Sequence, residues 1–140
     1  MAFTLKRLAA GDEAVFDRVA PDVFDEPIHG DRMRAYLRTP GHLLLLAMEG
    51  DLVIGQCAAV IHRHPDKVDE LYIDEVGTAS THRRQGVARA MMDEMFAWGR
   101  ELEITESWLG TELDNDEANG LYRGYKPVED TAIQYYLFAL

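Results

Sequence analysis

One stretch near the middle of the chain, residues 71–98, constrains the fold more than any other. Residues 71–76 are rich in strand-forming side chains, and the small residues at 77–80 interrupt that run. From Val87 onward, apolar residues recur at helical spacing, at positions 87, 88, 91, 92, 95, 96 and 98. The sequence therefore predicts a strand, a short turn and an amphipathic helix packed on that strand.

The turn between this strand and helix has the features of an anion-binding site. Its sequence is His82-Arg83-Arg84-Gln85-Gly86-Val87-Ala88. The first N–H groups of a helix have no intrahelical acceptors and lie at the positive end of the helix dipole. Gly86 and Ala88 leave the main chain accessible, and arginines at 83, 84 and 89 add positive charge. We expect a phosphate or diphosphate here, although neither a nucleotide P-loop nor a dinucleotide fingerprint is present.

The charge balance argues against nucleic acid and for a cationic partner. The net charge is −11, whereas affinity for nucleic acid depends on cationic contacts to phosphates. Residues 101–130 contain nine acidic and two basic side chains, but residues 82–89 contain three arginines and no acid. This distribution suits an anionic cofactor and an amine substrate. For most individual acids, simple solvation of the surface is an equally good interpretation.

Length and composition indicate one domain over residues 1–140 and a cytoplasmic location. The longest apolar run, residues 43–48, is too short to cross a bilayer, and the N-terminus lacks a signal-peptide pattern. Cys57 is the single cysteine, so an internal disulfide is excluded, and we expect it to be buried rather than reactive.

Periodicity and turn residues predict the element order β-α-α-β-β-β-α-β-α-β-β. The predicted strands are 3–8, 42–48, 52–62, 71–76, 106–113, 124–128 and 131–140, and the predicted helices are 12–20, 31–38, 87–103 and 114–123. Gly55 suggests a bulge, and Trp98 and Trp108 are expected in the core. His62, His64 and Asp66 are close in sequence, but no further ligand is indicated, so we expect no metal site.

Two motifs resemble the GNAT superfamily of N-acetyltransferases. Residues 83–88 match its acyl-CoA loop, Arg/Gln-x-x-Gly-x-Gly/Ala, and residues 115–122 match its closing motif, Asn-x-x-Ala-x-x-Leu-Tyr. Here one residue separates Tyr122 from Gly124, where three are usual. The element order also resembles this family, which implies an α/β (α+β) fold with a mixed sheet of about seven strands and about four helices. Locally, residues 70–76 and 82–88 are most similar to the small aminoglycoside 3-N-acetyltransferases.

The resemblance implies direct transfer of the acetyl group of acetyl-CoA to a primary amine of a small cationic, aminoglycoside-like or polyamine-like acceptor. It places the cofactor against the end of the central strand, the basic turn and the closing motif. The implied acetyl-CoA contacts are Val76, Gly77, Thr78, Arg83, Arg84, Gln85, Gly86, Val87, Ala88, Arg89 and Asn115. Asp22, Asp25 and Glu26 lie in a loop that covers the acceptor site in this family, so they are candidate amine contacts.

The chemistry requires a base, because an alkyl ammonium must lose a proton before it can attack a thioester. Asp74 and Glu75 are adjacent on the predicted strand, so we expect them to face opposite sides of the sheet. The resemblance favours Glu75 as the base over Asp74; a carboxylate that only attracts the substrate is the alternative. It also implies the backbone N–H of Val76 as donor to the thioester oxygen, and Tyr122 as proton donor to the thiolate.

Two other functions fit the same sequence. One is a GNAT-like module that binds acyl-CoA and regulates or scaffolds without turnover. The other is an acetyltransferase for protein lysines or N-termini, which requires a wide cleft. Dimers are common in the superfamily, which makes a homodimer a candidate assembly, although no stretch of this sequence indicates an interface.

Overall fold

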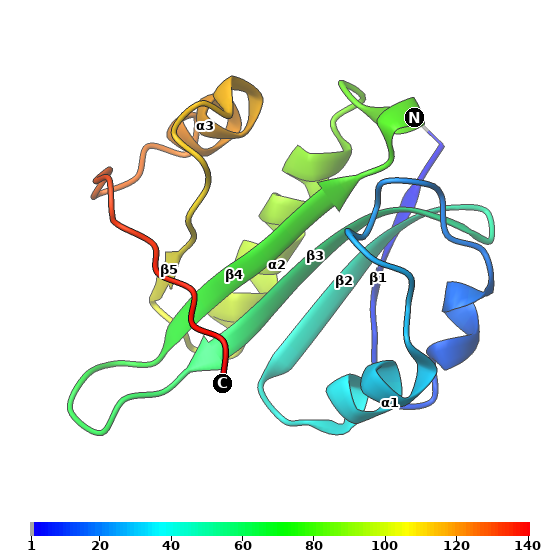
Figure 1. Cartoon of the computed structure of the whole chain (residues 1–140), viewed down its shortest axis with the longest axis horizontal. Helices are drawn as coiled ribbons and strands as arrows, with labels where there is room; N and C mark the ends of the chain where they lie inside the picture. The colour runs from blue at the N-terminus through cyan, green and yellow to red at the C-terminus, as the bar shows by residue number, and fades with distance from the viewer. Residues whose placement is uncertain (1) are drawn as a thin grey trace. The chain divides into compact units, whose positions relative to one another are not determined.

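The computed structural model describes residues 2–140 and comprises two compact units, Met1–Leu109 and Gly110–Leu140. The larger unit contains β1 (Thr4–Arg7), η1 (Glu13–Asp17), α1 (Gly30–Arg38), β2 (His42–Glu49), β3 (Leu52–His62), β4 (Glu70–Thr78), η2 (Ser80–His82), α2 (Val87–Glu101) and β5 (Glu106–Trp108) (Figure 1). The smaller unit contains α3 (Asp116–Arg123). Within residues 2–140, no helix is both long and apolar enough to cross a membrane.

All five strands belong to one mixed sheet in the order β1-β2-β3-β4-β5. β1 to β4 pair as antiparallel neighbours, and β5 runs parallel to β4 after the α2 crossover. β5 pairs only with residues 70–72 of β4. Among the strands of residues 2–140, none pairs with residues 73–78 on that side of β4. The C-terminal half of β4 therefore presents a backbone edge where β4 and β5 separate.

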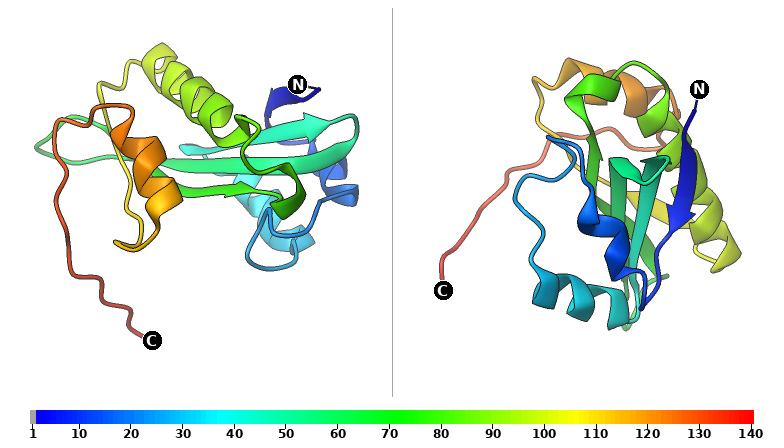
Figure 2. Two further views of the ribbon diagram at one scale, coloured as in Figure 1. Left: turned by 90° about the horizontal axis from the view of Figure 1, so that it is seen from above. Right: turned by 90° about the vertical axis from the view of Figure 1, so that its right-hand side faces the viewer.

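The two faces of the sheet are covered by different elements, as Figure 2 shows. α2 packs closely on one face, because a Cβ on Gly55 would lie 3.0 Å from side-chain atoms of Val87 and Met91. α1 and the segment before it cover the other face. There the carbonyl oxygen of Val23 approaches Gly77 so closely that a Cβ at that position would lie 2.2 Å from it. Glycine at these sites allows both layers to approach the sheet.

Apolar side chains from the sheet and α2 form the core of the larger unit. The largest apolar side chains that are almost fully buried are Leu45, Leu46, Ile54, Leu71, Met91, Met92 and Met95. The stripe predicted for residues 87–98 is thus confirmed as the face of α2 that packs on the sheet, with Val87, Met91, Met92 and Met95 buried. The basic turn lies at the solvent-accessible start of that helix.

The sheet has five strands rather than the predicted seven, and residues 2–140 contain three α-helices rather than four. Residues 12–20 form only the 3-10 helix η1, followed by an extended stretch. In that stretch Ala20 N–H donates to Val53 O at 2.9 Å, and Val53 N–H donates to Arg18 O at 2.9 Å. These bonds draw residues 18–20 alongside the start of β3, so tertiary pairing overrides the local preference for a helix.

The two strands predicted after residue 123 are absent, and β5 ends at Trp108 rather than at residue 113. The large apolar residues of the last segment, including Ile133, Tyr135 and Leu137, are exposed. Alternation indicates that a segment can form one apolar face, but a strand also requires a hydrogen-bonded neighbour. Within the smaller unit, residues 124–140 form no strand.

Candidate active site

A β-bulge in β4 places the two adjacent carboxylates. Ile73 is opposite Ala59 and Glu75 is opposite Ala58, so Asp74 is an extra residue on β4. In a bulge, two residues share one partner and alternation of side chains is interrupted. The prediction that Asp74 and Glu75 face opposite sides of the sheet is therefore wrong: both belong to the position opposite Ala58. That position lies on the face covered by α1, since Gly77 on the same face contacts Val23.

The close approach of the two carboxylates affects their acidity. The pKa of Glu75 is raised above its usual value, first by burial and then by the negative charges of Asp74 and Asp25. Burial also raises the pKa of Asp74, while a hydrogen bond from its own backbone N–H and the nearby His42 oppose that rise. A carboxylate with a raised pKa is a stronger base, which brings its proton affinity nearer to that of an amine.

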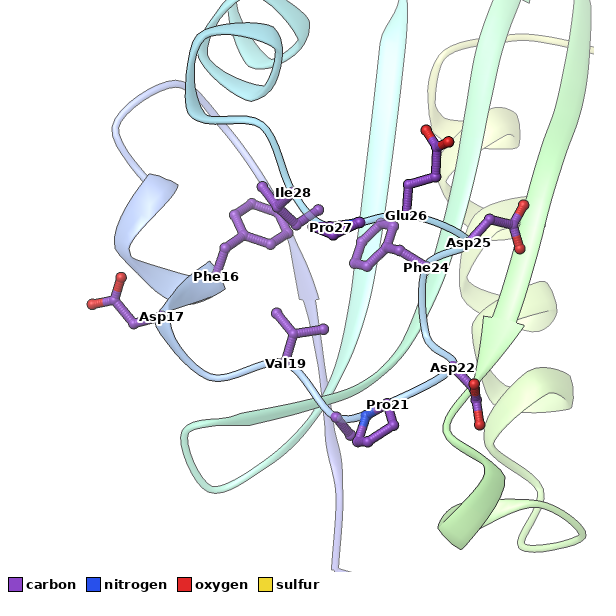
Figure 3. Close-up of a pocket in the computed structure, with 11 residues that line it drawn as sticks. Phe16, Asp17, Val19, Pro21, Asp22, Phe24, Asp25, Glu26, Pro27 and Ile28 are labelled. Atoms are coloured by element: carbon purple, nitrogen blue, oxygen red, sulfur yellow. The ribbon is translucent and has the colours of Figure 1, made fainter.

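The segment between η1 and α1 brings further acids to this face. It lines a pocket of about 480 Å³ together with η1, and this lining includes Asp22, Asp25 and Glu26 (Figure 3). In Figure 3, Asp22 and Asp25 lie on the side of the segment nearest β4. The segment is anchored to the sheet by Gln56, whose Nε2 donates to the Val23 carbonyl oxygen at 3.4 Å. The predicted amine contacts thus come from a loop packed directly on β4.

Tyr36 of α1 and His42 of β2 lie beside these acids, and the sequence did not indicate either of them. The Tyr36 hydroxyl donates to the Leu43 carbonyl oxygen at 3.1 Å, and the centroids of the Tyr36 and His42 rings are 5.0 Å apart. Burial strongly raises the pKa of Tyr36, and the charges of Asp74 and Glu75 add to that rise. The phenol therefore stays neutral and forms an apolar wall beside the carboxylates.

Trp108 is not in the core, contrary to the prediction from sequence. Its ring stacks on Tyr72 with centroids 4.2 Å apart and planes at 20°, and the residue is 41% exposed. Tyr72 is opposite Val60, which alternates with Ala58 along β3, so Tyr72 and Glu75 lie on the same face of the sheet. A partly exposed aromatic pair beside carboxylates can hold a cationic ligand through cation–π contacts as well as charge.

The start of α2 retains the predicted features of an anion site. Gly86 is the N-cap residue, with φ +79° and no side-chain hydrogen bond to the first turn of the helix. A Cβ on Gly86 would have no neighbour within 4 Å, so space for a ligand is open there. Arg83 and Arg84 are exposed, and φ +60° at Arg84 shapes the turn. The N-terminus of a helix and two exposed guanidinium groups suit a diphosphate.

The other residues predicted for this region divide between packing and exposure. Val87 is buried against Gly55, and Ala88 is half-buried, so both help to pack the start of α2 on the sheet. Gln85 and Arg89 are exposed. Val76, Gly77 and Thr78 end β4 on the edge that β5 leaves free. Backbone groups along that edge are available to pair with an extended ligand chain, as at any open sheet edge.

The smaller unit holds the closing motif as the predicted short helix. The Asn115 side-chain oxygen accepts a hydrogen bond from the Ala118 backbone N–H at 3.1 Å, and Asp116 and Glu117 occupy the first turn of α3. Asn115 therefore has a capping role in this helix. α3 ends at Arg123, one residue after Tyr122, and Gly124 follows as the C-cap. The catalytic role of Tyr122 stays a prediction.

Cys57 has the properties of a structural residue. Its side chain is fully buried between strands, and burial, with a smaller effect of Asp74, raises its pKa to about 12. A thiol with such a pKa holds almost no thiolate at neutral pH, and the thiolate is the nucleophilic form. A buried thiol of this kind is poorly suited to act as an acyl-accepting nucleophile.

Residues 12–125 match the acetyltransferase (GNAT) family, and the chain belongs to that family. It is therefore an acetyltransferase that uses acetyl-CoA. No curated protein sequence matches the chain significantly.

Solved structures support the fold at low sequence identity. The aminoglycoside acetyltransferase meta-AAC0020 from an uncultured soil metagenomic sample, in complex with sisomicin, aligns with a TM-score of 0.82 and 17% identity, covering 99% of this chain and 97% of that one. AAC(6')-Iy with a CoA-S-monomethyl-acetylneamine bisubstrate analogue gives 0.80, 14% identity and complete coverage of both chains. The ribosomal-protein-alanine N-acetyltransferase from Brucella melitensis biovar Abortus 2308 gives 0.75 and 17% identity, covering 98% and 100%.

Proposed function

We propose that this enzyme acetylates a primary amine of a small cationic acceptor, aminoglycoside-like or polyamine-like, with Glu75 as the general base. The observation that carries this proposal is that Asp74 and Glu75 share the bulge position opposite Ala58, with Asp25 near enough for its charge to raise the pKa of Glu75. Carboxylates from two separate segments of the chain share one face of the sheet, so an acceptor with more than one positive charge would relieve their mutual repulsion. The net charge of −11 adds long-range attraction for a cation.

The residues of this face have distinct roles in the proposed reaction. Glu75 accepts the proton that the attacking ammonium group loses, directly or through one water molecule. Asp74 and Asp25 hold the remaining positive charge of the acceptor, and the Tyr72–Trp108 pair supports its body. The solved complex of meta-AAC0020 with sisomicin, a fold relative, adds to the case for an amine-rich acceptor.

The cofactor side of the reaction uses the end of β4 and the start of α2. When bound, acetyl-CoA supplies an activated carbonyl carbon, which forms a bond to the amine nitrogen as its bond to the CoA sulfur breaks. The N–H groups of the first turn of α2, with Arg83 and Arg84, bind the diphosphate. The Val76 N–H donates to the carbonyl oxygen as negative charge develops there, which contributes about 3 kcal/mol in comparable sites. Tyr122 is the proposed proton donor to the departing thiolate.

A thiol-release assay with acetyl-CoA and a panel of acceptors tests this proposal. The panel contains aminoglycosides, polyamines, single amino acids, and peptides with free N-termini or lysines. We expect turnover with polycationic small molecules and little turnover with monoamines of the same size. Turnover only with peptides would refute the small acceptor and favour a protein acetyltransferase. Acetyl-CoA binding without thiol release from any acceptor would instead favour a regulatory module.

A further inference from the structure

Three potential metal ligands converge where the β3–β4 hairpin leaves the sheet. His62 is the last residue of β3 and is opposite Glu70, the first residue of β4. His64 follows two residues later in the connection. One ligand atom from each of these side chains lies within 4.8 Å of the others. The sequence predicted no metal site because a third ligand was not apparent, and the strand register now supplies Glu70.

The distances in this cluster are close to those of a metal-binding site. Glu70 Oε1 lies 2.7 Å from His64 Nε2 and 3.6 Å from His62 Nδ1. Ligand atoms around a tetrahedral Zn²⁺ lie about 3.3 Å apart, given bonds of about 2.0–2.1 Å. The His62 and His64 rings already face each other with centroids 4.3 Å apart. Small side-chain rotations would open the His64–Glu70 pair to accept an ion.

The neighbouring charged groups leave this cluster free to act as three ligands. Asp66 pairs with Lys67, and Asp69 pairs with Arg63, so each nearby aspartate has its own cation. Two imidazoles and one carboxylate are ligands that suit Zn²⁺ and related transition-metal ions better than Mg²⁺ or Ca²⁺. A water molecule would complete a tetrahedral set.

From this geometry we propose that His62, His64 and Glu70 bind one Zn²⁺ ion that fastens the base of the β3–β4 hairpin. The site lies at the start of β4, eight residues from Thr78, which corresponds to about 26 Å along an extended strand. In Figure 1 this hairpin extends from the end of the sheet opposite the start of α2. The ion would therefore stabilise the fold, because it binds the native hairpin and not the unfolded chain.

Calorimetric titration of the full chain with Zn²⁺, after treatment with a chelator, tests the site directly. We expect one Zn²⁺ per chain and, at a saturating concentration, a rise in Tm of about 5–10 °C. Mg²⁺ should give neither heat nor a shift in Tm. Amide hydrogen exchange should slow with zinc in residues 63–69 and remain the same at the start of α2.

Single substitutions separate a metal site from an ordinary ion pair. His62→Ala and Glu70→Gln should each weaken Zn²⁺ binding by more than about 10-fold, since even supporting residues of metal sites change affinity by this factor. His82→Gln is the matched control, because it removes a different histidine–carboxylate pair, His82 Nε2 to Glu49 Oε2 at 3.2 Å. It should bind Zn²⁺ as the wild type does.

For each variant, the Tm with zinc is compared with the Tm of the same variant without metal. A substitution that destabilises the metal-free protein therefore does not affect the comparison. If His64 and Glu70 form only an ion pair, Glu70→Gln will lower the metal-free Tm and zinc will shift no variant. That result, or equal zinc binding by wild type and His62→Ala, would overturn the proposal. His62 is half exposed, so its substitution is compatible with folding.

Discussion

Glu75→Gln is the substitution that most directly tests the proposed base. It keeps the size and shape of the side chain and one acceptor oxygen, but it removes the negative charge and the ability to accept a proton. Because the pKa of Glu75 is raised in the folded protein, the neutral form is favoured there. The stability that this preference provides is present below the unfolded pKa and is lost as pH rises through the folded value. At neutral pH a neutral glutamine side chain at this position should therefore leave the Tm unchanged or slightly higher.

The size of the activity loss expected for Glu75→Gln depends on Asp74, which the bulge places on the same face of the sheet. General-base catalysis typically contributes about 10²–10⁴-fold, or roughly 3–5 kcal/mol of barrier. Asp74 shares the same face and can accept a proton through a water molecule, so the single substitution should lose only about 100-fold in kcat/KM. Asp74→Asn alone should lose much less. The double variant should lose more than the product of the two single losses, because each carboxylate then has no substitute.

The assay is acetyl-CoA thiol release with the best acceptor of the panel, measured from acidic to alkaline pH. Affinity for acetyl-CoA, measured by calorimetry, should be nearly the same in all variants. The wild-type kcat/KM should fall as pH drops through the raised pKa of Glu75. If Glu75→Gln keeps wild-type activity while Asp74→Asn loses it, the base is Asp74 and the assignment is refuted. If the double variant is also fully active, neither carboxylate is the base.

Three further predictions concern the surroundings of the base. Asp25→Asn removes one of the negative charges that raise the pKa of Glu75. The acidic limb of the pH–rate profile should therefore move to lower pH. An unchanged limb would mean that Asp25 does not act on the base. Trp108→Ala should raise the KM for the amine roughly fivefold, corresponding to about 1 kcal/mol, with little change in kcat. An equal fall in kcat would contradict a role in binding alone. Gly86→Glu should weaken acetyl-CoA binding at least about 10-fold relative to Gly86→Ala, measured by calorimetry. Both changes impose the same left-handed strain of about 1–2 kcal/mol, so equal affinities would argue against an anion site at this position.

The sequence by itself determined the elements whose signals are local. The strand formers of residues 71–76, the small residues after them and the apolar stripe from Val87 were sufficient to predict β4, the turn and α2. Gly86 indicated an open helix start, and the structure places it there with a positive φ. A capping residue and two acids in the first turn likewise predicted a helix over 114–123, and α3 lies there, with Asn115 rather than Asp114 as its N-cap. These features are predictable because propensity, capping and periodicity depend on residues only a few positions apart.

Tertiary structure alone decided how the acids are arranged and where the aromatic and metal-binding side chains lie. The extra residue at Asp74 arises from the register between β3 and β4, and that register placed two carboxylates on one face against the expectation from alternation. The same register brought Glu70 beside His64, and the short β5 left Trp108 exposed on Tyr72. Register is set by pairing between residues far apart in sequence, so a pattern within one strand specifies which residues can share a face but not which ones meet.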